Sequence, residues 1–381
     1  MNSLFTRRQF MWGGVCAAAA AGGGFSPMQT LAAKPGSSPE LVEVMFYKKL
    51  AENKIECGVC PKRCKIAPLE RGYCGNKENR EGKYYTLVYG AVCAAHVDPI
   101  EKKPLFHYLP GSPAFSIATA GCNFECRFCQ NWQIAQYRPE QVRNEHMPPE
   151  RVVELAGLSG SRTIAYTYSE PVVFYTFMYD TARLARRAGI GSVMISNGYI
   201  LPGPMEKLCE VLTGVKIDLK AFTEKFYKNT CSGELKPVLE TLKLLKRLGM
   251  WTEIVVLIVP TLNDGKEEIK RMCRWILDNL GPDVPVHFTR FHPSYKIKNL
   301  PPTPLATLET AHRIGRETGL HYVYLGNVWG HPAENTYCPK CGKIVIRRIG
   351  YKVAAMEVKG GKCKFCGFAV AGVWNDPAKR A

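Results

Sequence analysis

GCNFECRFCQNW, residues 121–132, is the stretch that decides how this chain folds and what it binds. Its cysteines, Cys122, Cys126 and Cys129, have the spacing C-x-x-x-C-x-x-C. Residues 115–119 just before it are predicted to form a strand. The cysteines then lie in the loop at the carboxyl end of that strand, where barrels of strands and helices place their sites. Three thiolates hold three irons of a 4Fe-4S cubane and leave the fourth iron open to a substrate or cofactor.

Short β-branched runs alternate with amphipathic stretches after this motif. This alternation predicts an α/β fold with right-handed crossovers and a parallel sheet. Six or so units are too few for a closed eight-stranded barrel and favour a partial (β/α)6 TIM-like barrel. The predicted strands are 115–119, 163–167, 192–196, 215–219, 252–259, 286–290 and, more weakly, 322–325. The predicted helices are 149–158, 173–188, 234–248, 266–280 and 304–318.

Two further cysteine groups flank this region, among 16 cysteines in all. The C-terminal pairs are typical of a zinc ribbon, in which four thiolates close a tetrahedral site. The N-terminal group suits zinc, which we favour, or a second iron–sulfur cluster; in an oxidising compartment two disulfides are the rival. Cys93, Cys209, Cys231 and Cys273 stand alone and are expected to be small core residues. The N-terminal group is Cys57, Cys60, Cys64 and Cys74, and the C-terminal pairs are Cys338, Cys341, Cys363 and Cys366.

The N-terminus is typical of a targeting signal. Residues 6–10, TRRQF, form a twin-arginine pattern, and an apolar stretch at 11–25 is shorter than the roughly 20 residues of a membrane span. The predicted organisation is this signal at 1–33, an N-terminal cysteine-rich module with its lead-in at 34–110, a core at 111–330 and a C-terminal module at 331–381. A short helix is expected at 41–52, and no transmembrane span.

Net charge is +18 over 381 residues. This excess of positive charge would favour binding to nucleic acid, a membrane surface or an anionic partner. No long basic run carries interleaved aromatics, which argues against nucleic acid and leaves an anionic cofactor or an acidic protein to use the charge.

Residues 110–330 resemble the radical S-adenosylmethionine (SAM) superfamily, in its activating-enzyme branch, which includes pyruvate formate-lyase activase. The closer resemblance is to the radical SAM component of the AmmeMemoRadiSam system. It rests on DPIEKKPL at 98–105, PGS at 110–112, GCNF at 121–124, CQNW at 129–132 and YLGNV at 324–328. The resemblance implies that SAM chelates the open iron and is cleaved by one electron to a 5′-deoxyadenosyl radical. An electron donor such as flavodoxin or ferredoxin would supply that electron.

The resemblance also assigns roles to residues at the strand ends. Glu170 takes the place of the carboxylate that binds the methionine ammonium, although Tyr168 and Ser169 depart from the usual glycines. The alternative is a carboxylate that only starts a helix. Ser196 and Asn197 would bind ribose or the methionine carboxylate, or form a plain turn.

Two further positions belong to the same implied site. Asp218 and Lys220 are expected on the interior face as catalytic groups, or as a buried ion pair without a catalytic role. His292 resembles the activase histidine near the ribose and is preferred to His287, which lies inside its strand. Phe128 would lie against the adenine.

Three functions follow from these observations. The first is an enzyme that cleaves SAM to activate or modify a partner protein, or an unidentified substrate of the AmmeMemoRadiSam system. The second is an iron–sulfur electron carrier or metal-binding scaffold without catalysis. The third is an RNA-modifying radical SAM enzyme. Export by a twin-arginine signal conflicts with the cytosolic supply of SAM and reductant, so the sequence leaves the compartment open between cytoplasm and periplasm or cell envelope.

Overall fold

The computed structural model of the protein describes residues 41–375. The predicted signal at 1–33 lies outside them. Within the described part, no helix is long and apolar enough to cross a membrane.

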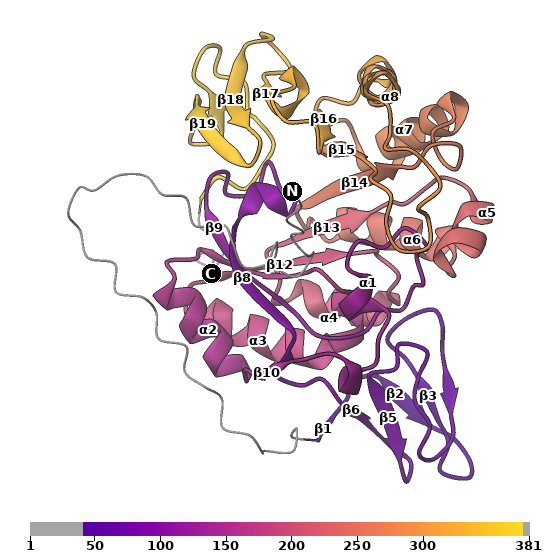
Figure 1. Ribbon diagram of the computed structural model, residues 1–381. Coiled ribbons are helices and arrows are strands. Elements are labelled where there is room, and N and C mark those ends of the chain that lie inside the picture. The colour runs from indigo at the N-terminus through magenta and orange to yellow at the C-terminus, as the bar shows by residue number, and fades with distance from the viewer. Residues whose placement is uncertain (1–40, 376–381) are drawn as a thin grey trace, which may run out of the picture. The chain divides into compact units, whose positions relative to one another are not determined.

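An eight-stranded mixed sheet forms the centre of the fold (Figure 1). Seven strands run parallel and are joined by helices, so the predicted parallel sheet is confirmed. An eighth strand, β8 (Ala94–Pro99), pairs antiparallel with β9 at one edge and was not predicted. In order across the sheet from β8, the parallel strands are β9 (Pro113–Ala118), β11 (Thr163–Tyr166), β12 (Gly191–Ser196), β13 (Gly214–Asp218), β14 (Thr252–Ile258), β15 (Val286–Arg290) and β16 (Val323–Gly326).

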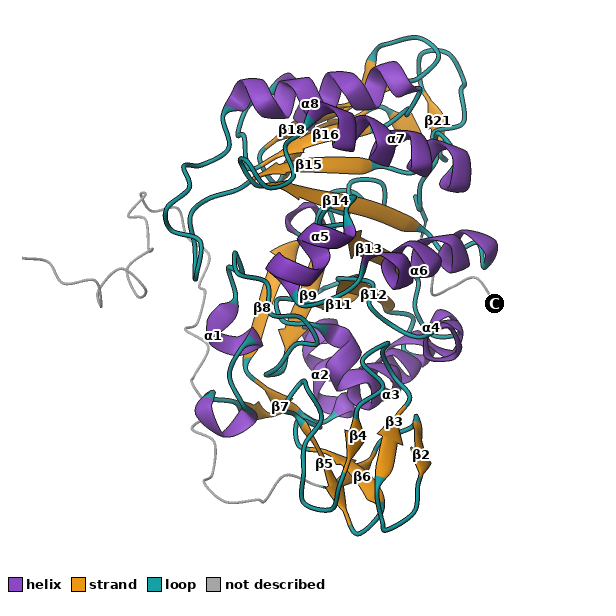
Figure 2. Cartoon of the chain, turned by 90° about the vertical axis from the view of Figure 1, so that its right-hand side faces the viewer, coloured by secondary structure: helices purple, strands orange, loops and turns teal. Residues whose placement is uncertain are grey.

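Six helices of eight or more residues connect the parallel strands, one per crossover (Figure 2). Their apolar residues recur every three or four positions, as in α7, where Ile269, Met272 and Ile276 are buried. On the sheet, Ile254, Val256 and Phe288 join the same apolar core, and their neighbours in sequence face the opposite side. The helices are α2 (Pro149–Leu158), α3 (Tyr175–Arg187), α4 (Pro202–Cys209), α6 (Leu235–Arg247), α7 (Lys266–Leu280) and α8 (Leu305–Thr318).

The segment after β8 crosses the other face of the sheet. It includes the 3₁₀ turn η2 (Ile100–Lys102) and packs Leu105 and Tyr108 against Val193 in a separate apolar cluster. Glu253 of β14, with no exposed surface, accepts hydrogen bonds from the backbone N–H groups of residues 106 and 107 at 2.9 and 2.8 Å. A side chain more than 140 positions away therefore fixes this segment, which we call the floor segment (residues 100–109).

The N-terminal module consists of short antiparallel strands. They are β1 (Val42–Glu43), β2 (Tyr47–Lys49), β3 (Ile55–Cys57), β4 (Lys65–Ile66), β5 (Lys77–Arg80) and β6 (Lys83–Thr86). The helix predicted at 41–52 is therefore wrong. Val42 pairs with Thr86 and Tyr47 pairs with Cys57, so pairing with distant strands overrides the local preference of the Glu- and Lys-containing segment.

The C-terminal module consists of hairpins and lies at the opposite end of the central sheet from the N-terminal module (Figure 1). Its elements are η6 (Pro332–Glu334), β17 (Thr336–Tyr337), β18 (Ile344–Ile349), β19 (Lys352–Met356), β20 (Val358–Lys359) and β21 (Lys362–Cys363). Smaller elements complete the fold: β7 (Ala91–Val92), β10 (Glu145–His146), α1 (Trp132–Ala135), η3 (Pro139–Gln141), η4 (Pro171–Phe174), α5 (Glu224–Phe226) and the π-helical turn η5 (Tyr227–Cys231).

Candidate functional site

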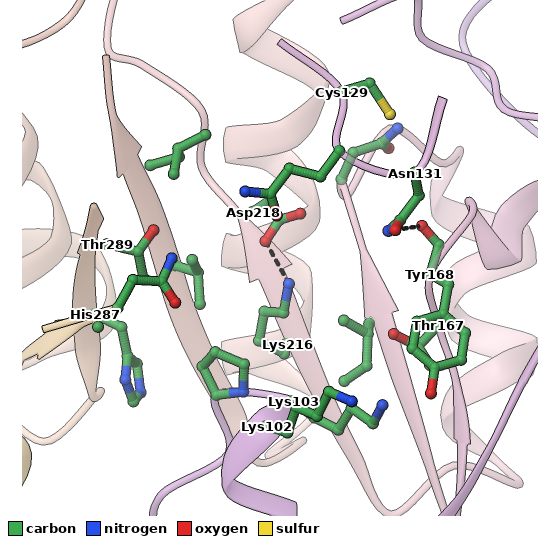
Figure 3. A pocket seen from close by; sticks show the side chains of 18 of the residues that line it. Lys102, Lys103, Cys129, Asn131, Thr167, Tyr168, Lys216, Asp218, His287 and Thr289 are labelled. Carbon is green, nitrogen blue, oxygen red and sulfur yellow. Dashed lines mark hydrogen bonds and ion pairs between the residues drawn. The ribbon is translucent and has the colours of Figure 1, made fainter. Parts of the chain in front are cut away.

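A cavity of about 550 Å³ lies at the carboxyl ends of the parallel strands. Cys129 lies at one end of the view in Figure 3, and Lys102 and Lys103 lie at the other. The floor segment supplies the two lysines, and the C-terminal module supplies Tyr351 to the wall. The cavity is thus bounded by the sheet, the cysteine loop and two segments far apart in the sequence.

The cysteine loop brings three thiols to this cavity. Cys122, Cys126 and Cys129 all line it. The loop is held by backbone hydrogen bonds of 2.9 Å from the N–H groups of residues 125 and 127 to the carbonyl groups of Cys231 and Thr230 in η5. Three converging thiols beside an open space fit the donor set of a 4Fe-4S cluster with one open iron.

A fourth cysteine lies against this loop and was not expected there. The Cys231 thiol donates a hydrogen bond to the sulfur of Cys126, and this bond lowers the pKa of Cys126. Burial acts in the opposite direction, and the positive charge of Lys220 lowers the pKa further. From the sequence, Cys231 is expected to be an isolated core residue. Because it lies 105 positions from Cys126, no local spacing could have paired the two.

Glu170 follows β11 and lines the cavity with its carboxylate almost fully buried. One oxygen accepts from the Ser196 hydroxyl at 2.6 Å and from the N–H of Val172 at 3.1 Å; the other accepts from the N–H of Asn197 at 2.8 Å. Burial raises the pKa of Glu170, and these three donors oppose the rise. Since each carboxylate oxygen accepts about two hydrogen bonds, one acceptor position remains for a cationic group in the cavity.

Asn197 lines the cavity directly, whereas Ser196 does not reach the cavity and donates its hydroxyl hydrogen bond to Glu170. The Asn197 amide also donates to the side chain of Asn123, which lies within the cysteine loop, at 2.8 Å. The strand end at 196–197 therefore connects the carboxylate of Glu170 to the loop that carries the cysteines.

Asp218 and Lys220 both line the cavity, as the alternation of β13 predicts. Lys216, two positions earlier on the same face, also lines it and forms an ion pair with Asp218 (Figure 3). The Lys220 ammonium lies 3.4 Å from the other carboxylate oxygen. Burial alone would raise the pKa of Asp218, but the two ammonium groups hold it below its ordinary value. Lys216 was missed, although the two-residue alternation that placed Asp218 and Lys220 would have found it.

At the end of the cavity away from the cysteines, Asp98 holds the lining side chains in place. Its carboxylate pairs with Lys102 at 2.8 Å and Lys103 at 2.5 Å, and it accepts a hydrogen bond from the Tyr168 hydroxyl. Burial lowers the pKa of Lys103 to about 8, against the effect of its bond to Asp98. Tyr168 takes a left-handed φ of 64°, which a glycine adopts without strain, and the bonds to Asp98 and from the Asn131 amide hold it there.

The structure places His287, not His292, in the cavity wall. His292 is exposed and lies beyond the end of β15, where the chain has left the sheet. His287 is buried within the strand and contacts Glu253 at 2.9 Å. The preference for His292 therefore needs correction, because strand alternation turns the side chain of His287 toward the interior.

Phe128 is buried and lines the cavity between the last two cysteines of the motif. The Lys220 ammonium lies 5.8 Å from the centre of its ring. Its ring gives the cavity an apolar wall next to Asp218 and Lys220.

The four C-terminal cysteines converge on one point. The sulfur atoms of Cys338, Cys341, Cys363 and Cys366 all lie within 4.8 Å of one another, with pairs at 3.6 and 3.8 Å. Zn–S bonds of about 2.3 Å place tetrahedral sulfur ligands about 3.8 Å apart, so this group fits a single metal ion.

The four N-terminal cysteines also share one small cavity, which is separate from the first. Cys57, Cys60, Cys64 and Cys74 line it together with Lys77 and Tyr84. Their sulfur atoms are more widely spaced than those of the C-terminal group.

Comparison with known proteins gives four matches. The family model of the radical SAM superfamily matches residues 116–276. An uncharacterized protein of Methanocaldococcus jannaschii is 47% identical over 327 residues, 85% of this chain and 97% of that protein. The pyruvate formate-lyase-activating enzyme of Clostridium pasteurianum is 23% identical over 178 residues, 45% of this chain and 72% of that enzyme. Among solved structures, a radical SAM methyltransferase from Sphaerobacter thermophilus has a TM-score of 0.48 and 14% identity, covering 58% of this chain and 68% of that chain.

Proposed function

This chain belongs to the radical SAM superfamily, and from that premise we propose that it cleaves SAM reductively at a 4Fe-4S cluster held by Cys122, Cys126 and Cys129. The observation that carries the proposal is the arrangement of three thiols beside a cavity of about 550 Å³ whose wall offers a partly unused buried carboxylate. When bound, the cluster supplies one electron that breaks the sulfonium bond of SAM and yields a 5′-deoxyadenosyl radical.

The residues of the chain bind and orient SAM. Glu170 accepts a hydrogen bond from the methionine ammonium with the acceptor position that Ser196 and Asn197 leave unused. Because these neighbours also hold the carboxylate in one orientation, it is arranged before SAM arrives. Phe128 gives the adenine an apolar wall.

Asp218 and Lys220 form the charged part of the wall next to the cysteines. Lys216 and Lys220 keep Asp218 ionised, so its oxygens can accept hydrogen bonds from the ribose hydroxyls. His287, on the neighbouring side of the cavity, takes the place proposed from the sequence for His292.

The substrate lies beyond SAM, toward Lys102 and Lys103. We propose a partner protein or an unidentified substrate of the AmmeMemoRadiSam system, in line with the activating-enzyme relatives and the motifs at 98–105 and 324–328. A ferredoxin or flavodoxin is the proposed electron donor. The open sheet is proposed to curve as a partial barrel, and the C-terminal cysteines to hold structural zinc.

The test is anaerobic reconstitution with iron and sulfide, reduction with dithionite and measurement of 5′-deoxyadenosine after addition of SAM. Wild type is expected to form it, and Cys126→Ala is expected to form none. Cys209→Ala, which removes an isolated cysteine of α4, is the matched control and should behave as wild type. A wild type with a full cluster that forms no 5′-deoxyadenosine would refute the proposal.

The same preparation distinguishes between a SAM-cleaving enzyme and a non-catalytic electron carrier. SAM that binds an open iron changes the electron paramagnetic resonance spectrum of the reduced cluster, whereas a cluster with four protein ligands gives no such change. An unchanged spectrum would favour the non-catalytic alternative.

A further inference from the structure

The four N-terminal cysteines are arranged around an enclosed space. Cys57 ends β3, Cys60 and Cys64 lie in the turn to β4, and Cys74 precedes β5. The turn is fixed by backbone bonds from the N–H of Cys57 to the carbonyl of Cys64 at 2.9 Å and from that of Arg63 to Cys60 at 3.1 Å. No disulfide joins these four cysteines, so their sulfur atoms are available as ligands.

The spacing of the sulfur atoms distinguishes between zinc and a cluster. Among the residues that the structure describes, only the C-terminal cysteines form a group of three or more ligands within 4.8 Å of one another. The N-terminal cysteines do not meet this limit, and neither do the three of the 121–132 motif. One zinc ion needs sulfur atoms about 3.8 Å apart, whereas the four irons of a cubane hold them further apart. No three of the four N-terminal sulfur atoms lie within 4.8 Å of one another, so the group is wider than a four-thiolate zinc site, as is the group of the 121–132 motif.

A buried lysine next to the N-terminal cysteines indicates that these cysteines hold a negatively charged group. Lys77 is 3% exposed and its ammonium lies 3.7 Å from the sulfur of Cys74. Within residues 41–375 it forms no ion pair with a carboxylate. A buried ammonium needs a compensating negative charge, and here thiolates bound to a metal supply it.

The group lies directly beside the 121–132 motif. The carbonyl oxygen of Cys74 is so close to Gly121 that a Cβ there would meet it at 2.9 Å, and the Asn76 amide donates to the carbonyl of Ala120 at 3.0 Å. Asn123, which follows the first cysteine of the motif, lines the N-terminal cavity itself. The segments that carry the two cysteine groups are therefore in direct contact.

We propose that Cys57, Cys60, Cys64 and Cys74 hold a second 4Fe-4S cluster that passes electrons to the first. With four protein ligands this cluster has no open iron, so electron transfer is the chemistry left to it. A reduced ferredoxin or flavodoxin gives up one electron, the second cluster gains it and then passes it to the first. No bond or proton moves in this step. At this site we therefore favour the cluster over the zinc expected from the sequence.

The test compares metal contents of the full chain after anaerobic reconstitution. Wild type should hold about eight irons and eight sulfides, with about one zinc at the C-terminal cysteines. A triple variant, Cys122→Ala, Cys126→Ala and Cys129→Ala, should keep about four irons and lose the response to SAM. A double variant, Cys60→Ala and Cys64→Ala, should also keep about four, with the response intact. Cys209→Ala is the control.

A triple variant with almost no iron and a wild type with about two zinc ions would overturn the proposal. Because the iron of the triple variant is counted without any activity, this result is independent of whether SAM is cleaved. If a cysteine variant does not fold, the Mössbauer spectrum of wild type still counts the clusters. Lys77→Met adds a second readout: loss of the buried cation should shift one of two reduction potentials to a more negative value and leave iron content unchanged.

Discussion

Replacement of Glu253 by glutamine tests whether one side chain fixes the floor of the cavity. The wild-type carboxylate accepts four contacts: the N–H of Phe106 and the His287 ring at one oxygen, and the N–H of His107 and the Trp251 indole at the other. A glutamine amide has one acceptor oxygen and one donor NH₂. In either orientation, the NH₂ faces a backbone N–H of the floor segment.

The magnitude follows from this count. The favourable orientation lets His287 accept from the NH₂ and leaves the N–H of Phe106 without an acceptor, a loss of about 1–3 kcal/mol. The remaining bonds lose the charge of the carboxylate, which roughly halves their strength. We expect a total of roughly 2–4 kcal/mol in the free energy of unfolding, which for a chain of this length corresponds to a fall in Tm of roughly 3–5 °C.

The assay is thermal unfolding of the metal-loaded protein under anaerobic conditions. The control is Glu240→Gln on α6, where an exposed carboxylate pairs with Lys243 at 3.2 Å and should contribute less than about 1 kcal/mol. If Glu253→Gln unfolds within about 1 °C of wild type, as the control should, the floor segment is not held by Glu253 and the reasoning is refuted.

Three further outcomes are expected. Asp218→Asn should lower the rate of 5′-deoxyadenosine formation by at least about tenfold, because Lys216 and Lys220 lose their counter-charge beside the cofactor; an unchanged rate in a single-turnover assay would exclude this role. Burial lowers the pKa of His107 to about 4, so its contribution to stability is complete above about pH 6.5 and is lost as the pH falls through about 4. His107→Phe should flatten the pH dependence of Tm between about pH 6.5 and pH 4. If Tm of the variant falls with pH as steeply as that of wild type, His107 is not the group responsible. Removal of zinc with a chelator should unfold the C-terminal module around Cys341 without bleaching the iron absorbance; joint loss of both would show that the sites are coupled.

The sequence predicted those features that depend on neighbouring residues. The cysteine spacings at 122–129 and 338–366, the alternation that turns Asp218 and Lys220 inward and the β-branched strands are all local signals. The parallel sheet follows from them, because strand–helix alternation allows few other arrangements.

Features that depend on distant pairing were not predictable in the same way. Strand β8 and the floor segment are specified by partners such as Glu253, and Cys231 meets Cys126 only after the sheet has formed. The helix expected at 41–52 does not form, because pairing with β3 and β6 decides the structure of this segment. Single sequences carry no signal for such contacts.

The floor segment also has a consequence for how the protein is made. The N–H of Leu109 bonds to the carbonyl of Val373, and the His107 ring bonds to the carbonyl of Ala371, 264 positions later. A ribosome synthesises Ala371 264 residues after the His107 that it contacts. The cavity therefore acquires its floor only after residues 371–373 have been made, and a nascent chain that already displays its three cysteines still has an incomplete site. Under the proposed function, a cluster and SAM would reach their final geometry only after the C-terminal module has docked on the floor segment.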